Sequence, residues 1–393
     1  MIEREAKDAL LRLCSQFPIV GVTGPRQSGK TTLCQSVFPE KRYVTMDNKS
    51  MRSIAEEDPT EFINAFPDGA IIDEAQKVPE IFDALKEHVD STPYFPGKFI
   101  LTGSSQFRLK ENMTDSLAGR ASFLQLLPFT IKELNNVGRI SNDPYELILN
   151  GQYPPLYDNE KNYLKNDWYK SYIDTYVDLD VKDNINQSNV STFKKLIQLC
   201  AHRSGELLSM DNLAHNLGVS QPTVKSWIHI LERSYIIHLL QPDSTNLGRS
   251  LIKTPKLYFV DTGLLCYLLR IENKSDLLLS PYKGHVVETF AVSELLKNKL
   301  NQGKDANLTF YRDAAGLEVD VVADWRQRYA IEIKSSFTTE SKLAVGTKKY
   351  VGMSNEINSD PAQSVVFYLG DLTVNLNNTH YIGWKDWSDF CSK

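Results

Sequence analysis

The stretch GPRQSGKT, from Gly24 to Thr31, constrains the fold of this chain more than any other segment. It matches the pattern G-x-x-x-x-G-K-[ST] in full, follows the apolar run FPIVGVT and precedes the helix-like segment KTTLCQSVF. Glycines permit backbone angles that other residues resist, so successive N–H groups can point inward at a helix N-terminus. In this context the loop predicts a phosphate site rather than a glycine turn that only joins a strand to a helix.

The loop is predicted to hold ATP together with Mg²⁺. The Lys30 ammonium would reach the β- and γ-phosphates, and the Thr31 hydroxyl would bind the metal. Arg26 would add positive charge beside the phosphates or reach outward to a neighbour. The predicted ATP-binding residues are Gly24, Pro25, Arg26, Gln27, Ser28, Gly29, Lys30, Thr31 and Thr32.

Two adjacent acids, Asp73 and Glu74, follow the apolar run AII. In a doubly wound sheet the carboxyl ends of the strands converge on the ligand crevice, which would bring Asp73 near Thr31 to hold Mg²⁺, directly or through water. Glu74 is predicted to act as the general base on the attacking water. The alternative is a pair of acids that caps the helix after the strand.

Two more segments near this region carry side chains that suit ATP hydrolysis. The strand KFILTGSS ends in hydroxyl residues, and Thr102, Ser104 or Ser105 would sense the γ-phosphate or the water unless they serve only the turn. Arg120 precedes the apolar run ASFLQLLPF. It would stabilise transition-state charge in cis or across a subunit interface of a homo-oligomer, or else it is a surface arginine.

Length and periodicity predict several domains. The chain has 393 residues, which is too many for one ordinary core. Short apolar strands alternate with helices at first, which predicts an α/β fold with a doubly wound, mostly parallel sheet; helices then dominate, and the last part mixes helix and strand. We predict an ATPase domain at 1–145, a helical domain with a winged helix-turn-helix at 146–272, and a mixed α/β domain at 273–393.

Composition argues against several classes of protein. A net charge of -5 gives no overall attraction to nucleic acid or anionic membrane, so DNA contact would need local patches. Five scattered cysteines without a CxxC pair indicate reduced thiols. No apolar run approaches the roughly 20 residues of a membrane span, and the N-terminus lacks the apolar core of a signal peptide. We expect a cytoplasmic protein without a membrane segment.

The middle segment LLSMDNLAHNLGVSQPTVKSWIHILER predicts a helix-turn-helix. Gly218 would supply the turn, Ser220 would cap the next helix, and Pro222 is tolerated in its first turn. YIIHLL and KLYFVD would form the wing. The second helix is not strongly basic, so DNA binding and communication between the outer domains are both open. Further residues that would supplement a basic patch are Arg203, Arg233, Arg249 and Lys253.

A second charged group lies near the C-terminus. EVDVV and AIEIKSS are alternating strands that a short polar turn joins into a hairpin. Glu332 and Lys334 share one face of their strand, Asp320 lies on the preceding strand, and Glu288 lies on an upstream helix predicted to be amphipathic. This order resembles the PD-(D/E)xK nuclease core. The resemblance implies that the three acids bind Mg²⁺ and that Lys334 positions or activates water; the alternative is an ordinary Glu–Lys pair.

The motifs together also resemble a known family. GPRQSGKTTL, IIDEAQKVPEIFDALK, FILTGSS, SLAGRA and LLPFTIKEL look, in order and spacing, like the AAA-type ATPases of the AAA_14 family. VDTGLLCYLL, VVETFAVSELL, EVDVV and AIEIKSS resemble the DUF4143 region that accompanies it. The resemblance implies an additional-glutamate P-loop ATPase, a winged helix and a restriction-endonuclease-like C-terminal domain. It carries the phosphate-loop, metal, base and LAGR-arginine roles onto Lys30, Thr31, Asp73, Glu74 and Arg120.

The predicted function is ATP hydrolysis coupled to a DNA-directed C-terminal module with nuclease chemistry. The rival is an ATP-dependent switch, in which an inactive nuclease-like domain binds DNA or a protein partner. A small-molecule kinase is a further alternative, but the glutamate beside Asp73 and the two additional modules argue against it.

Overall fold

The computed structural model divides into two compact units. Unit 1 consists of Met1–Phe129, Arg233–Tyr235 and Leu300–Lys304, and unit 2 consists of Thr130–Glu232, Ile236–Lys299 and Asp305–Lys393. Unit 2 holds both the helical and the mixed segments, and the finer division into three domains stays a prediction. The residues that the structure describes are 2–103, 113, 116–177, 181, 185–243, 252–357 and 361–393.

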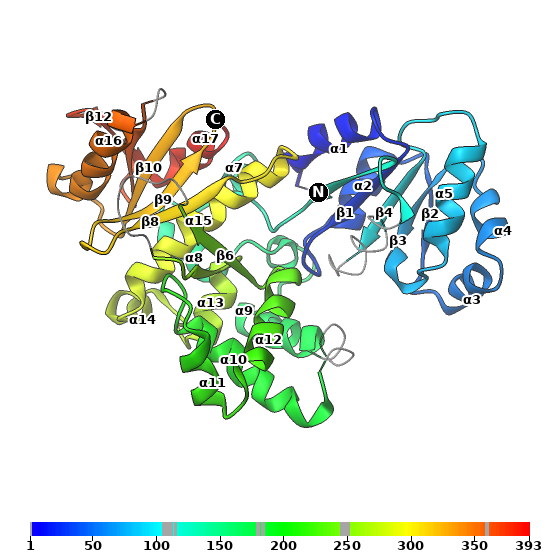
Figure 1. The fold of residues 1–393 in the computed structure, drawn as a ribbon, viewed down its shortest axis with the longest axis horizontal. Helices are drawn as coiled ribbons and strands as arrows, with labels where there is room; N and C mark the ends of the chain where they lie inside the picture. The colour runs from blue at the N-terminus through cyan, green and yellow to red at the C-terminus, as the bar shows by residue number, and fades with distance from the viewer. Residues whose placement is uncertain are drawn as a thin grey trace. The chain divides into compact units, whose positions relative to one another are not determined.

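Unit 1 is built on a parallel sheet (Figure 1). Its side chains alternate between two cores, with Ile71 and Ile100 in one and Ile72 and Leu101 in the other. Because both faces are covered, the strands need no polar side, which explains their continuous apolar runs. The predicted doubly wound parallel sheet is confirmed. Its strands in spatial order are β2 (Arg42–Thr45), β3 (Ala70–Asp73), β4 (Phe99–Gly103), β1 (Ile19–Thr23) and β5 (Ala121–Gln125).

Each of the two cores of unit 1 combines side chains of the sheet with side chains of the helices that cover it. The first two helices contribute to the core that contains Ile71, and the next three contribute to the core that contains Ile72. Burial of each large aliphatic side chain contributes about 1.5–3 kcal/mol, so the two faces hold the sheet firmly. The helices are α1 (Ala6–Cys14), α2 (Lys30–Val37), α3 (Lys49–Glu57), α4 (Pro59–Asn64) and α5 (Ile81–Ser91).

The helical part of unit 2 includes the predicted helix-turn-helix. Helix α11 (Met210–Leu217) ends at Gly218, whose φ of 67° favours glycine. The Thr223 N–H donates to Ser220 Oγ at 3.3 Å at the start of α12 (Gln221–Arg233), so the predicted turn and cap are confirmed. The other helices before the large sheet are α7 (Ile131–Asn135), α8 (Pro144–Asn150), α9 (Lys165–Tyr176) and α10 (Val190–Ala201).

A mixed sheet organises the rest of unit 2. The predicted hairpin of β9 and β10 is confirmed as an antiparallel pair, while β10 and β11 run parallel. The two predicted wing strands, β6 and β7, pair antiparallel, and β6 also pairs with β8, so they form one edge of this same sheet. The strands in spatial order are β12 (Val374–Leu376), β13 (Thr379–Gly383), β11 (Gln363–Tyr368), β10 (Arg328–Lys334), β9 (Glu318–Asp324), β8 (Leu308–Arg312), β6 (Ile237–Pro242) and β7 (Lys256–Phe259).

The remaining helices of unit 2 follow β7 along the chain. A short pair comes directly after β7, a long helix precedes β8, and the last two flank the C-terminal strands. These helices are α13 (Thr262–Leu268), α14 (Lys274–Leu279), α15 (Lys283–Asn301), α16 (Val345–Ile357) and α17 (Trp387–Cys391).

The long helix α15 is buried on more sides than its predicted amphipathic pattern implies. The apolar side chains Val287 and Phe290 are buried, but so are the polar side chains Glu294, Lys297 and Asn298, each at most 2% exposed. The expectation of one solvated face is therefore wrong for the middle of this helix. Its polar residues can be buried because hydrogen-bonding partners from other parts of unit 2 satisfy them.

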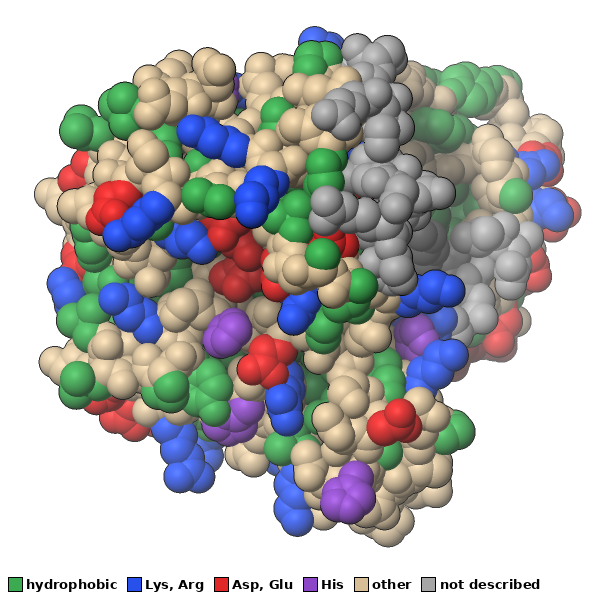
Figure 2. Space-filling model, turned by 60° about the vertical axis from the view of Figure 1, so that its left-hand side comes forward, with side chains coloured by type: hydrophobic (Ala, Val, Ile, Leu, Met, Phe, Trp, Pro, Cys, Tyr) green, Lys and Arg blue, Asp and Glu red, His purple; other side chains and the backbone are tan. Residues whose placement is uncertain are grey.

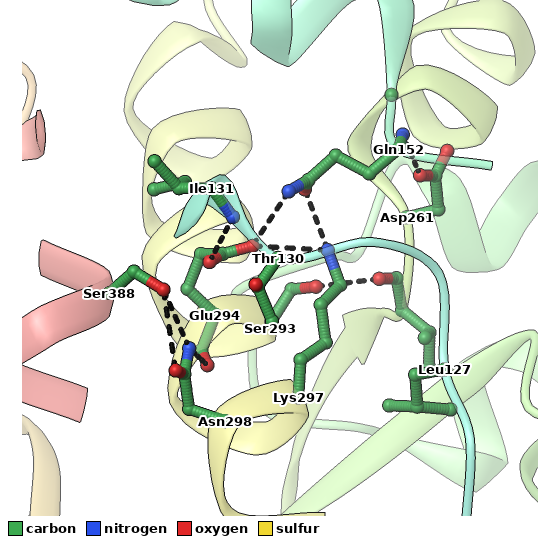
Figure 3. Close-up of polar contacts among 12 residues, drawn as sticks. Leu127, Thr130, Ile131, Gln152, Asp261, Ser293, Glu294, Lys297, Asn298 and Ser388 are labelled. Atoms are coloured by element: carbon green, nitrogen blue, oxygen red, sulfur yellow. Dashed lines mark hydrogen bonds and ion pairs between the residues drawn. The ribbon is translucent and has the colours of Figure 1, made fainter. Parts of the chain in front are cut away.

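Figure 3 shows these partners around Glu294 and Lys297. Glu294 accepts hydrogen bonds from Ile131 N at 2.9 Å, from Gln152 Nε2 at 2.8 Å and from Lys297 Nζ at 3.2 Å. Lys297 also donates to Gln152 Oε1 at 2.6 Å. A buried ion pair is tolerated when its remaining lone pairs and protons are bonded, so the network fixes α15 within unit 2.

Two general predictions can be compared with the structure. Across the described ranges, no helix is long and apolar enough to pass through a membrane. All five cysteines are buried, and burial raises the pKa of Cys14 and of Cys266 to about 12.

Candidate functional sites

The predicted phosphate loop connects β1 to α2 at the carboxyl edge of the parallel sheet. Gly24 has a φ of 151° and Gly29 a φ of 93°, which explains why glycine stands at both positions. A Cβ on Gly24 would lie 2.1 Å from the carbonyl oxygen of Leu126, so no larger residue fits there. The loop therefore has the backbone that its sequence pattern predicts.

The side chains of the loop lie at different depths. Lys30 is buried, and its Nζ donates to Gly24 O at 3.0 Å and Pro25 O at 2.8 Å. Ser28 Oγ is buried and has no hydrogen-bond partner among the described atoms, which suits a site for an oxygen-rich ligand. Of the other predicted ATP-binding side chains, Pro25 is buried, Arg26 is half-buried, and Gln27 and Thr32 are exposed.

Asp73 lies at the centre of the polar contacts at this edge. Thr31 Oγ1 donates to Asp73 Oδ1 at 3.0 Å, Thr102 Oγ1 donates to the same oxygen, and Tyr43 OH donates to Oδ2 at 2.8 Å. The contact of Thr102 follows from strand order, since β4 lies between β1 and β3. The hydroxyl of Thr31 and the carboxylate of Asp73 are the hard oxygen ligands that Mg²⁺ prefers, so this pair fits the predicted metal. Ser104 and Ser105 lie outside the described residues.

Glu74 directly follows the end of β3. Its φ of 53° and ψ of 40° are left-handed, a conformation that costs a residue other than glycine on the order of 1 kcal/mol. Gln76 Nε2 donates to Glu74 Oε2 at 2.5 Å, and Gln76 is buried. Glu74 makes no side-chain cap to the short helix Ala75–Lys77, so the capping alternative does not describe it. Gln76 holds the carboxylate instead.

Arg4 is a part of this site that no motif predicts. Its guanidinium donates to Ser28 O at 2.6 Å and to Leu127 O at 2.6 Å, and it lies 4.9 Å from the centre of the Phe129 ring. The side chain is buried. Hydrogen bonds from a charged donor are among the stronger ones, so Arg4 ties the loop to the chain that follows β5. Tyr43 was missed for the same reason, since neither residue belongs to a recognisable pattern.

Arg120 lies away from the phosphate loop, and its predicted role in cis is wrong. β5 runs parallel to β1 with Ala121 opposite Ile19, so Arg120 precedes the amino end of its strand. The loop leaves the carboxyl end of β1, about 16 Å away at roughly 3.3 Å per residue. The guanidinium of Arg120 donates to the two carboxylate oxygens of Asp90 at 2.6 Å and 2.8 Å. A role across a homo-oligomer interface stays a prediction.

The second predicted group lies in unit 2, around a pocket of about 540 Å³. Glu288 from α15, Asp320 from β9 and Glu332 from β10 all line it. Lys334 Nζ lies 2.6 Å from Glu332 Oε1, so the four predicted residues are brought together. Figure 2 shows a face on which Asp and Glu side chains gather, with Lys, Arg and His side chains around them.

The carboxylates of this acidic pocket influence one another. Asp320 Oδ2 accepts a hydrogen bond from Ile333 N at 2.8 Å. Burial and the nearby Glu288 raise the pKa of Asp320, and burial and Asp320 raise the pKa of Glu332. Within the described part of the chain, no group of three or more His, Cys, Asp or Glu residues is arranged to hold a metal ion.

Lys256 is the residue of the acidic pocket that the sequence did not predict. It comes from β7, and its side chain is only 4% exposed. Its Nζ lies 2.7 Å from Glu318 Oε1 and 3.3 Å from Glu288 Oε1. Burial opposes its charge, but Glu288, Asp320 and Glu318 raise the pKa of Lys256 overall. KLYFVD is read from sequence only as a wing strand, so nothing in the pattern places this lysine among acids.

An all-parallel sheet, a complete G-x-x-x-x-G-K-[ST] loop and an acidic pair at the end of β3 define unit 1 as an AAA-type P-loop ATPase domain. The AAA domain of the AAA_14 family matches residues 16–135, and the domain of unknown function DUF4143 matches residues 283–387. A further domain of unknown function, DUF8612, matches residues 141–275. The chain belongs to the family of AAA_14 ATPases that carry a DUF4143 region.

Similar proteins align with most of this chain. The uncharacterized protein Mb2031c of Mycobacterium bovis is 30% identical over 337 residues, which cover 85% of this chain and 74% of that protein. The uncharacterized protein MJ1544 of Methanocaldococcus jannaschii is 20% identical over 341 residues, which cover 79% and 73%. Among solved structures, the Walker-type ATPase PABY2304 of Pyrococcus abyssi is 15% identical, with a TM-score of 0.45 over 68% of this chain and 96% of that one.

Proposed function

We propose that the chain binds ATP with Mg²⁺ at the phosphate loop and hydrolyses it. The observation that carries this proposal is the contact of Thr31 with Asp73, with Glu74 as the next residue of the chain. The backbone of the loop and Lys30 would bind the phosphates, and Thr31 and Asp73 would hold the metal. Mg²⁺, when bound, offsets the charge that develops on the phosphate oxygens.

In this proposal Glu74 acts as the general base. Its carboxylate would accept a proton from the water that attacks the γ-phosphate. Gln76 supports the role because its amide donates to one carboxylate oxygen and restricts the direction of the other. Thr102 lies on the neighbouring strand and donates a hydrogen bond to Asp73. Its side chain would therefore respond to ATP and Mg²⁺ bound at the carboxyl edge of the sheet.

The test of nucleotide binding is the Lys30→Ala variant. We expect it to lose ATP binding, measured by fluorescence of a labelled ATP analogue, because the phosphates lose their positively charged partner. Lys49→Ala is a matched control, since Lys49 is an exposed lysine in the same unit. Unchanged affinity in Lys30→Ala would mean that the loop is not the binding site.

We also propose that unit 2 is directed to DNA by the helix-turn-helix. In α12 the side chains of Lys225, Ser226 and His229 are exposed, while Trp227 is buried, so the helix offers a polar face. Fluorescence anisotropy with duplex DNA tests this. Lys225→Ala should weaken binding and lower the slope of log affinity against log salt by about 1, whereas exposed Lys349→Ala on α16 should not. Equal salt slopes would exclude α12 as the contact.

For the nuclease-like site, one observation favours the rival function, an ATP-dependent switch with an inactive nuclease-like domain, over DNA cleavage. Lys256 contacts Glu288 and Glu318 inside the acidic pocket, where a cleaving site would need carboxylates for a metal. We therefore propose that ATP controls the assembly or partner binding of the chain, and that unit 2 binds DNA without cutting it. A cleavage assay with Mg²⁺ or Mn²⁺ and ATP, beside Lys334→Ala, tests this: cleavage that Lys334→Ala abolishes would refute it.

A further inference from the structure

The acids of the acidic pocket already have partners within the chain. Glu318 is shared by Lys256 and Arg312, with closest N–O distances of 2.7 Å and 3.6 Å. Glu288 accepts a hydrogen bond from Tyr258 OH at 2.6 Å besides its contact with Lys256. A cation that bound these carboxylates would have to displace protein groups that are held by the sheet.

Lys256 in particular is held in place by its surroundings. It belongs to β7, which pairs with β6, and its Nζ lies 5.6 Å from the centre of the Phe310 ring. Its side chain is almost fully buried, so its charge is compensated by Glu288 and Glu318 rather than by water. An ammonium among carboxylates at these distances is attracted more strongly than in water because the dielectric constant of the protein is lower, which offsets the cost of burial.

We infer that Lys256 takes the place of a divalent metal ion in the acidic pocket, so that the native chain binds neither Mg²⁺ nor Mn²⁺ there. The protein itself, through Lys256, supplies the positive charge that stabilises the carboxylates of Glu288, Glu318 and Asp320. The acidic pocket then needs no metal ion. Removal of the Lys256 ammonium should convert the pocket into a cation site. This inference does not rest on ATP hydrolysis, because the pocket lies within unit 2.

The ordinary alternative is that Lys256 is a structural ion pair beside a working metal site. The two accounts differ in what happens to Mn²⁺. If Lys256 replaces the metal, the native chain has no Mn²⁺ site that depends on Asp320. If it only stabilises the fold, such a site exists with or without the lysine.

Titration calorimetry of the full chain with Mn²⁺, without nucleotide, separates these accounts. Lys256→Met keeps the length and apolar stem of the side chain but removes its charge. We expect Lys256→Met to gain one Mn²⁺ per chain, with an affinity at least about tenfold tighter than any Mn²⁺ binding of the native chain that depends on Asp320, because unpaired carboxylates attract a cation. Adding Asp320→Asn should abolish the gain. Mn²⁺ binding at unit 1 is common to all these proteins and does not affect the difference.

Lys194→Met is the matched control, because Lys194 pairs with Asp174 at 2.6 Å elsewhere in unit 2. It should gain no site. The inference is overturned if a folded Lys256→Met binds no additional Mn²⁺. A second comparison covers the case in which Lys256→Met does not fold: the native chain and Asp320→Asn should bind the same amount of Mn²⁺, and a loss of binding in Asp320→Asn would overturn the inference by itself.

Discussion

The hydroxyl of Thr31 donates a hydrogen bond of 3.0 Å to the carboxylate of Asp73. Thr31 lies in the first turn of α2 and Asp73 is the last residue of β3, and the two meet because parallel strands end at one edge of the sheet. The contact joins the phosphate loop to the acidic pair, and the proposed hydrolysis depends on it.

Replacement of Thr31 tests the metal role of this contact. Thr31→Val keeps the shape of the side chain but removes its hydroxyl. We expect the Mg²⁺ concentration for half-maximal ATP hydrolysis to rise about 10- to 100-fold, because one oxygen ligand is lost. The measurement is a Mg²⁺ titration of phosphate release. Thr31→Ser keeps the hydroxyl and should restore the native requirement; an unchanged requirement in Thr31→Val would exclude the role.

Gln76 is expected to position the general base. Gln76→Leu removes the hydrogen bond to Glu74 Oε2 while filling similar space. We expect kcat for ATP to fall roughly 10- to 100-fold with KM unchanged, because a misplaced base affects the chemical step more than binding. Steady-state phosphate release checks this, with Gln16→Leu at an exposed position as control. A rise in KM with unchanged kcat would instead indicate a part in ATP binding.

Arg4 is expected to brace the phosphate loop. Arg4→Met removes its hydrogen bonds to Ser28 O and Leu127 O and leaves both carbonyls without this donor. The free energy of unfolding should fall by about 3–6 kcal/mol, since each of the two lost hydrogen bonds to this charged group contributes roughly 1.5–3 kcal/mol. Urea denaturation measures this. Arg12→Met, which loses one exposed hydrogen bond to Gln302 O, should cost less than about 1 kcal/mol. Equal losses would contradict the bracing role.

Local sequence patterns predicted those parts of the structure whose functional residues lie close together along the chain. The loop from Gly24 to Thr31, the acids at the end of β3 and the hairpin that carries Asp320 and Glu332 each lie within a short segment with its own periodicity. The approach of Asp73 to Thr31 was also predictable, because strand ends of a parallel sheet share an edge.

Contacts between distant segments without a motif were not predictable. Arg4 reaches Ser28 and Leu127, and Lys256 reaches Glu288 and Glu318, only because the fold brings separate elements together. The buried middle of α15 was misjudged for the same reason: Glu294 and Lys297 look solvated in sequence, but partners elsewhere in unit 2 satisfy them. The position of Arg120 relative to the loop was not predictable either, because it depends on the register of β5 with β1.

The proposed hydrolysis is tested most directly by the rate of phosphate release from ATP in Glu74→Gln, beside Glu57→Gln, an exposed glutamate of α3. The amide keeps the size of the side chain but cannot accept the proton of the attacking water. We expect Glu74→Gln to bind ATP and to release phosphate at least about 100-fold more slowly than the native chain. Hydrolysis at the native rate would contradict the assignment of Glu74 as the base.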